Sequence, residues 1–210
     1  MKNSLFNPEN WLWHPFAKIT DFLLLSALWI FSCIPIVTIG SAFTSLYDCS
    51  AHCVKDGEKG MFSRYLRTLR RELIPSMISF LLWSVIIGVI YSFIRKFTAS
   101  ANSSMLNMII AYASTILLIL VVGIASWVFP LLSRFTFNVA DLNLTAFRLA
   151  IMYIPRTISL GVCTSLAIWL CLRLWIPLMI IPGIYGLVSA NILEPVFKEY
   201  EEKQQIENQN

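Results

Sequence analysis

The sequence places two cysteines and a histidine within one short segment: Cys49, His52 and Cys53. Thiolate and imidazole are ligands that zinc prefers, and structural zinc sites use four of them. The only other histidine, His14, precedes the first apolar stretch and supplies no obvious fourth ligand. The interpretation we favour is that the two cysteines are small apolar residues of the interior. We therefore expect no metal and no cofactor.

The same residues also suggest nucleophilic catalysis. His52 is close enough in sequence to act as a base for Cys49, but nothing else in the chain suggests an oxyanion site. A phosphate-binding loop of the type Gly-x-x-x-x-Gly-Lys-Ser/Thr is absent from the sequence. The net charge of +4 does not come from a basic soluble domain, so we expect no nucleic-acid partner. The sequence predicts no catalytic residues and no enzymatic activity.

The composition indicates the elements that carry these residues. Hydrophobic residues make up 57% of the 210 positions and charged residues 13%, against roughly 25% charged in soluble domains. The mean hydropathy is +0.69. Long stretches without charge predict helices that cross the lipid bilayer. We expect an all-α polytopic membrane helix bundle with five transmembrane helices, near residues 20–40, 73–94, 108–132, 157–172 and 175–193.

Two amphipathic stretches follow the first predicted span. The first has Thr44, Asp48, His52 and Lys55 on a polar face, opposite an apolar stripe that begins at Phe43. The second alternates large apolar side chains with Arg64, Arg67, Arg70 and Arg71. We expect a cytoplasmic amphipathic hairpin over residues 41–72, whose arginines face anionic lipid or dock on a partner protein. Lipid contact is the favoured interpretation.

The distribution of Lys and Arg predicts an orientation. Most of them lie in the hairpin, in the segment between the third and fourth spans, and in the tail. Because basic segments remain in the cytoplasm, five spans place the N-terminus outside and the C-terminus inside a bacterial cell membrane. We expect one transmembrane domain over residues 1–197 and a frayed polar tail over residues 198–210.

Polar residues near the membrane are the best functional candidates. Pro35 interrupts the first span and is followed by Thr38 and Gly40, a pattern that frees a backbone carbonyl and allows a kink. Proline-broken helices occur in transporters, and they also occur in membrane helices that transport nothing.

Four charged or titratable residues form a second group of candidates. Asp48 lies one helical turn before His52, so the two side chains are expected to share a hydrogen bond. Arg134 and Asp141 follow the third span, on the same expected side of the membrane as Asp48. An ion pair between these segments would hold them together.

The stretch Ile34-Pro-Ile-Val-Thr-Ile-Gly-Ser-Ala-Phe-Thr-Ser-Leu-Tyr47, with Gly57-Glu58 and the basic segment from Phe62 to Arg71, resembles the bacterial YesL-like membrane proteins. The similarity extends over nearly the whole chain in length and in the arrangement of spans. The resemblance implies a multi-pass protein of the plasma membrane whose biochemistry is not established. It also implies a link to carbohydrate uptake, because members are often encoded beside sugar-uptake and polysaccharide-degradation genes.

Two functions follow as expectations. The first is an accessory or regulatory component of carbohydrate uptake, with the bilayer and the permease or sensor subunits of a sugar ABC transporter as its partners. The alternative is a small stand-alone transporter for an uncharged solute such as a sugar, whose mid-membrane polar groups would include Ser26, Thr38 and Ser126. The sequence leaves homo-oligomerisation open.

Overall fold

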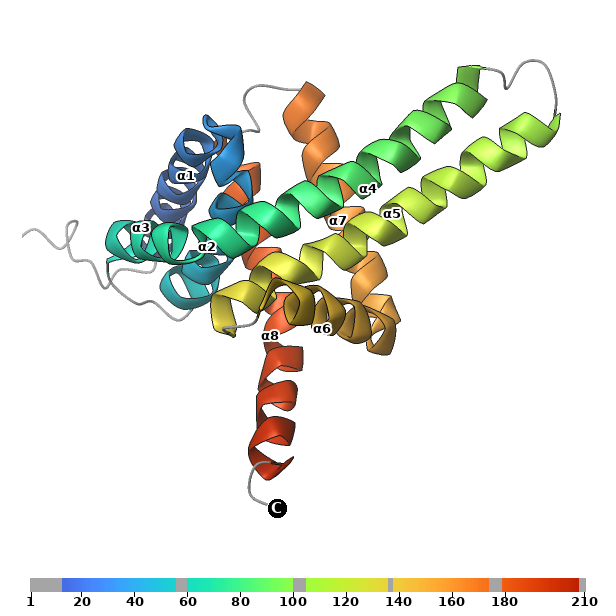
Figure 1. Cartoon of the computed structure of the whole chain (residues 1–210). Helices are drawn as coiled ribbons and strands as arrows, with labels where there is room; N and C mark the ends of the chain where they lie inside the picture. Colours follow the sequence, from blue (N-terminus) through green and yellow to red (C-terminus); the bar gives the residue numbers. More distant parts are fainter. Residues whose placement is uncertain (1–12, 56–59, 100–104, 136–137, 174–178, 208–210) are drawn as a thin grey trace, which may run out of the picture.

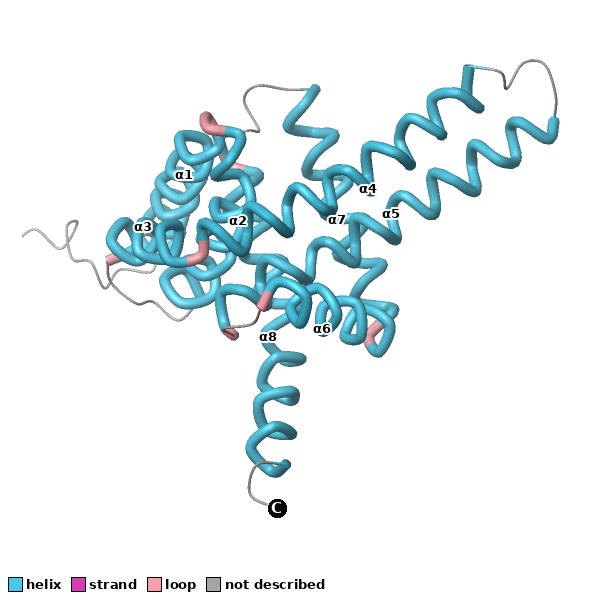
Figure 2. The backbone as a smooth tube through the Cα atoms, in the orientation of Figure 1, coloured by secondary structure: helices cyan, strands magenta, loops and turns pink. Residues whose placement is uncertain are grey.

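A computed structural model describes residues 13–55, 60–99, 105–135, 138–173 and 179–207 (Figure 1). These residues are almost entirely helical, and no strand occurs among them (Figure 2). The expected all-α class is confirmed. The elements, in chain order, are α1 (Trp13–Cys33), a 3-10 turn (Ile36–Thr38), α2 (Ile39–Cys49), a π-helix (Ser50–Lys55), α3 (Met61–Arg71), α4 (Leu73–Ala99), α5 (Met105–Arg134), α6 (Val139–Met152), α7 (Ile154–Arg173) and α8 (Ile181–Glu207).

Three helices within the described residues are long and apolar enough to cross a membrane: Leu73–Ala99, Met105–Arg134 and Ile154–Cys171. They coincide with the second, third and fourth predicted spans. Hydroxyl side chains do not interrupt them, because these side chains bond to carbonyls of the preceding turn. Ser114 of α5, for example, donates to the carbonyl oxygen of Ile110 at 2.7 Å. The sequence prediction of a membrane protein therefore agrees with the length and composition of these helices.

The first predicted span, 20–40, is not one helix. Its apolar helical part, Thr20–Cys33, is shorter than a full span, and the chain breaks at Pro35, which has no N–H for a continuing helix. The Thr38 hydroxyl donates to the carbonyl oxygens of Ser32 and Pro35. These bonds satisfy two carbonyl groups at the break. The sequence predicts a kink here, and the chain instead reverses its direction.

The segments on either side of the break, α1 and α2, pack against each other as an antiparallel pair (Figure 1). The Trp29 ring meets the Phe43 ring edge-on, with centroids 5.3 Å apart. Farther from the turn, Leu25 and Leu46 belong to one buried cluster. A Cβ on Gly40 would lie 2.5 Å from the carbonyl oxygen of Ser76, so α2 can approach α4 this closely only with glycine there.

The fifth predicted span, 175–193, is also different in the structure. Residues 174–178 lie outside the described residues, and α8 does not meet the hydropathy of a span. From Ile181 this helix continues to Glu207, so residues 198–207 of the expected frayed tail are helical. The continuation has a packing reason, because Val196 and Phe197 are fully buried and the Phe197 ring meets the Trp127 ring at 6.2 Å.

The amphipathic interpretation of residues 41–72 also needs correction. Helix α2 packs against α1, α3, α4, α5 and α8, so the first part of the face expected to be wet is inside. Thr44 and Asp48 are buried, whereas His52 is partly exposed and Lys55 is exposed. On α3 the polar side chain of Thr68 is buried. Sequence alternation indicated two faces here, but it could not show that the polar face meets another helix.

The main hydrophobic core joins α5, α6, α7 and α8 around Trp127, Leu160 and Leu193. Where α5 crosses α7, Gly123 lies against Gly161. A Cβ on Gly123 would come within 2.5 Å of the carbonyl oxygen of Thr157. Small residues at such a crossing allow two membrane helices to make backbone contact.

Candidate functional site

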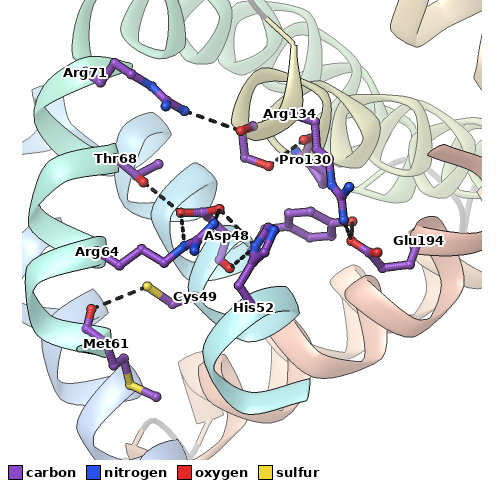
Figure 3. Close-up of polar contacts among 12 residues, drawn as sticks. Asp48, Cys49, His52, Met61, Arg64, Thr68, Arg71, Pro130, Arg134 and Glu194 are labelled. Atoms are coloured by element: carbon purple, nitrogen blue, oxygen red, sulfur yellow. Dashed lines mark hydrogen bonds and ion pairs between the residues drawn. The ribbon is translucent and has the colours of Figure 1, made fainter. Parts of the chain in front are cut away.

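Asp48 is the centre of a buried polar cluster between α2 and α3 (Figure 3). Arg64 donates two hydrogen bonds to its carboxylate, from Nε to Oδ2 at 3.0 Å and from Nη2 to Oδ1 at 3.1 Å. The hydroxyl of Thr68, one turn later on α3, donates to Oδ2 at 2.7 Å. A two-pronged guanidinium pair with an added hydroxyl is a strong way to hold a buried carboxylate.

His52 contacts the same carboxylate from its own helix. Its Nδ1 lies 3.2 Å from Asp48 Oδ1 and 3.0 Å from the Asp48 carbonyl oxygen. The expected Asp48–His52 contact is therefore present. His52 belongs to the π-helix Ser50–Lys55 that continues α2, and π-helical turns are frequent at functional sites. The ring is partly exposed, so this end of the cluster faces outward.

A second buried carboxylate, Glu194 of α8, lies close to the first. Arg134, at the end of α5, donates to Glu194 Oε1 and has Glu201 at 3.6 Å. Glu194 and Glu201 are two turns apart, so they share one face of α8. The Tyr47 hydroxyl also donates to Glu194 Oε1, at 3.3 Å. Burial, reinforced by the Glu194 charge, raises the pKa of Tyr47 above its usual range, which keeps this donor protonated.

Arg71 closes the cluster at the α3–α4 junction. Its Nε lies 2.5 Å from Oε1 of the buried Glu72, and its Nη2 donates to the carbonyl oxygen of Ser133 at 3.3 Å. Arg71 therefore links α3 to the last turn of α5. That carbonyl has no partner within its helix, because it lies at the helix C-terminus, and a guanidinium is a suitable donor for it.

Together these residues form a cleft of about 340 Å³, which we call the arginine cleft. Four arginines from α3 and α5 line it against two carboxylates. The guanidinium of Arg67 makes no hydrogen bond or ion pair with the described part of the chain, and it is exposed. Such a cleft can receive an acidic group through charge-assisted hydrogen bonds. Its lining is Asp48, His52, Arg64, Arg67, Thr68, Arg71, Ser133, Arg134 and Glu201.

The structure therefore gathers six of the residues selected from the sequence and separates the others. Arg70 lies on α3 but does not line the cleft, and Asp141 is exposed in the first turn of α6. The ion pair expected to join Asp48 or Asp141 to Arg134 does not form, because Arg134 pairs with α8. Pro35, Thr38 and Gly40 belong to the α1–α2 turn. The six gathered residues are Asp48, His52, Arg64, Arg67, Arg71 and Arg134.

Sequence reasoning missed four contributors to the site. Glu194 and Glu201 had been assigned to a span end and a tail, and their seven-residue spacing on one helix was the available signal. Thr68 and Tyr47 carry no charge, and only their neighbours in space reveal their role.

The cysteines of the Cys-x-x-His-Cys motif lie away from this cleft. Cys49 is completely buried in the cluster with Leu25 and Tyr65, and its thiol contacts the Met61 carbonyl oxygen at 3.6 Å (Figure 3). Burial raises the pKa of Cys49 well above its usual range. His52 faces Asp48, and the described residues contain no group of three or more His, Cys, Asp or Glu side chains placed to hold a metal.

Known proteins give a short comparison. Neither a curated protein nor a solved structure shows significant similarity to this chain. One family model matches the segment from the middle of α1 to the last turns of α4, which carries six of the nine cleft residues. Residues 22–93, 72 of the 210 positions, thus match the family described as "Protein of unknown function, DUF624".

Proposed function

We propose that this protein is a non-enzymatic accessory component of a bacterial membrane complex, and that its arginine cleft binds an acidic segment of a partner subunit. The observation that supports the proposal is the arrangement of four arginines around one cleft beside the ends of α2 and α5. Three of them are fixed by carboxylates, while Arg67 is unpaired within the described residues. A fixed rim with an available guanidinium suits an incoming carboxylate.

The partner we propose is a subunit of the carbohydrate-uptake machinery, such as a permease or sensor subunit of a sugar transporter. This part of the proposal rests on the resemblance of Ile34–Tyr47 to YesL-like proteins. That resemblance names a narrower group of proteins than the family match does. The match is consistent with it, because it covers the α1–α2 turn and the arginines of α3. An ATPase of such a complex would be a separate chain.

The test is a pull-down of tagged protein from native membranes in mild detergent, with crosslinking and mass spectrometry. Arg67→Glu and Arg70→Glu make a matched pair, since both reverse one exposed charge on α3 and only Arg67 lines the cleft. We expect Arg67→Glu to reduce recovery of a stoichiometric partner at least tenfold and Arg70→Glu to leave it near the wild-type level. Equal recovery with both variants would reject the cleft as the contact.

A second function, stand-alone transport, is suggested by the apolar pockets between the helices. One of them, of about 380 Å³, lies between α1, α2, α7 and α8. Its lining hydroxyls, on Thr164 and Tyr185, bond to each other at 3.0 Å, so few polar groups remain for a sugar. We therefore rank transport second. Sugar counterflow by the purified protein in proteoliposomes would reverse this order.

A further inference from the structure

A group of apolar pockets, open at the side of the bundle, adjoins Tyr185 and is separate from the arginine cleft. The cavity of about 380 Å³ lies on one side of this residue, and a second of about 340 Å³ lies between α4, α5 and α7. Both have Phe43, Thr164, Ile168 and Tyr185 in their walls. Adjoining apolar pockets of this size are concave surfaces of the kind that bind a ligand.

The chemistry of the walls selects an apolar occupant. Aromatic and aliphatic side chains dominate both cavities, and a cavity with such a lining favours hydrocarbon over water. The hydroxyls of Ser126, Thr164 and Tyr185 form a chain of hydrogen bonds, at 2.9 and 3.0 Å, and so satisfy one another. They do not need a polar ligand.

One polar group in the wall is not satisfied in this way. Trp29 lines the larger cavity, and its indole N–H is buried without a hydrogen-bond partner among the described residues. A buried donor of this kind costs free energy unless an acceptor reaches it. The occupant should therefore combine a long apolar part with a single hydrogen-bond acceptor.

The cavity also has a connection to the lipid-facing side of the bundle. A groove of about 190 Å³ between α7 and α8 has Ala167, Ile181 and Tyr185 in common with the larger cavity. Two other residues of this groove, Leu166 and Ile184, are exposed apolar side chains. In a bilayer these side chains face acyl chains, so lipid has a direct route to the cavity.

From these observations we propose that the cavity between α1, α2, α7 and α8 is a lipid site. It binds one acyl chain of a bilayer lipid, with the ester carbonyl of that lipid accepting a hydrogen bond from the Trp29 indole. The site is independent of the proposed partner contact, because the arginine cleft and the cavity share no lining residue.

The test uses the full-length protein in vesicles of phosphatidylcholine that contain a small fraction of phosphatidylcholine with a diazirine in one acyl chain. After irradiation, crosslinked peptides are mapped by mass spectrometry. We expect label at Phe43 and near Ala167 in addition to label on exposed positions such as Leu81. Label confined to exposed positions would overturn the proposal.

A matched pair of substitutions tests occupancy. Ala167→Phe places a ring in the cavity wall, and Val162→Phe places the same ring at an exposed position of the same helix that lines none of these cavities. We expect the first to reduce cavity labelling at least fivefold and the second to leave it unchanged. An unchanged yield with Ala167→Phe in folded protein would overturn the proposal.

If Ala167→Phe does not fold, Trp29→Phe provides the test, because it removes the N–H and retains a ring. The variant is compared with two diazirine probes, one with ester-linked and one with ether-linked chains. We expect the labelling yield to fall about threefold for the ester probe, which carries the carbonyl acceptor, and to stay constant for the ether probe. An equal change with both probes, or no change with either, would overturn the hydrogen bond to Trp29.

Discussion

Asp48 is the residue on which the polar end of the molecule depends. Its carboxylate has three partners from two elements, Arg64, Thr68 and His52. Burying a carboxylate costs free energy, and these three partners offset that cost. We therefore expect the stability of the protein to fall strongly when Asp48 is lost and weakly when a residue at the edge of the cluster is changed.

We predict that Asp48→Asn lowers the free energy of unfolding by about 2–3 kcal/mol, because it leaves a partly buried guanidinium without its anion. The melting temperature in detergent should fall by about 4–12 °C. Asp141→Asn makes the same charge change at an exposed site and should have little effect. A small shift with both variants would show that the Asp48–Arg64 pair contributes little to stability.

The Cys49 thiol gives a second prediction at this scale. Its raised pKa means a smaller thiolate fraction at pH 8, and burial blocks access, so both effects slow alkylation. In single-cysteine variants, maleimide should modify Cys49 at least a hundredfold more slowly than a cysteine introduced by Lys55→Cys at an exposed position nearby. The difference should disappear in denaturant. Similar rates in the folded protein would contradict the buried position of Cys49.

At the scale of the elements, the close packing of α5 against α7 depends on two glycines. Gly123→Ala and Gly161→Ala each place a methyl group against the backbone of the opposite helix. We expect each to lower the free energy of unfolding by about 1–3 kcal/mol. Gly88→Ala in α4 is the control, since its added Cβ meets nothing within 4 Å, and the variant should be neutral or slightly more stable. Unfolding in detergent measures all three.

The elements also differ in how far the sequence could predict them. Helices α4, α5 and α7 were expected within a few residues, because each follows a long stretch without charge. The sequence predicts one span where the α1–α2 hairpin lies, because the apolar stretch continues past Pro35 and the hydroxyl bonds of Thr38 are not visible in sequence. The predicted contacts of Arg134 were wrong because its partner, Glu194, comes from a helix sixty residues later.

At the scale of the whole molecule, the α1–α2 hairpin changes the side of the membrane on which we expect the N-terminus. Leu25, near the middle of α1, belongs to one buried cluster with Met61 and Tyr65 of α3. Helix α2 returns antiparallel to α1 (Figure 1), so α1 begins at the end of the hairpin that leads into α3. The N-terminus should therefore be on the same side of the membrane as the arginines of α3. This differs from the outside N-terminus expected from five spans.

The topology prediction is tested by cysteine accessibility in a cysteine-free background. Cysteines replace Ser4, Lys59 and, in the α4–α5 connection, Ser103, and a membrane-impermeant maleimide is applied to intact and lysed cells. We expect Ser4→Cys and Lys59→Cys to react only after lysis and Ser103→Cys to react in intact cells. Labelling of Ser4→Cys in intact cells, with Lys59→Cys protected, would restore the outside N-terminus.

The lengths of the helices have a consequence for the membrane in which the protein works. Helix α5 has 30 residues and spans about 45 Å, whereas α7 has 20 residues and spans about 30 Å. A hydrocarbon core of about 30 Å accommodates the length of α7 upright, whereas α5 is longer than that core and must tilt, kink or extend into the headgroup region. The glycine crossing holds α5 and α7 in backbone contact, so a change in the tilt of one helix relative to the other disturbs this packing. Hydrophobic mismatch should therefore make this protein sensitive to acyl-chain length.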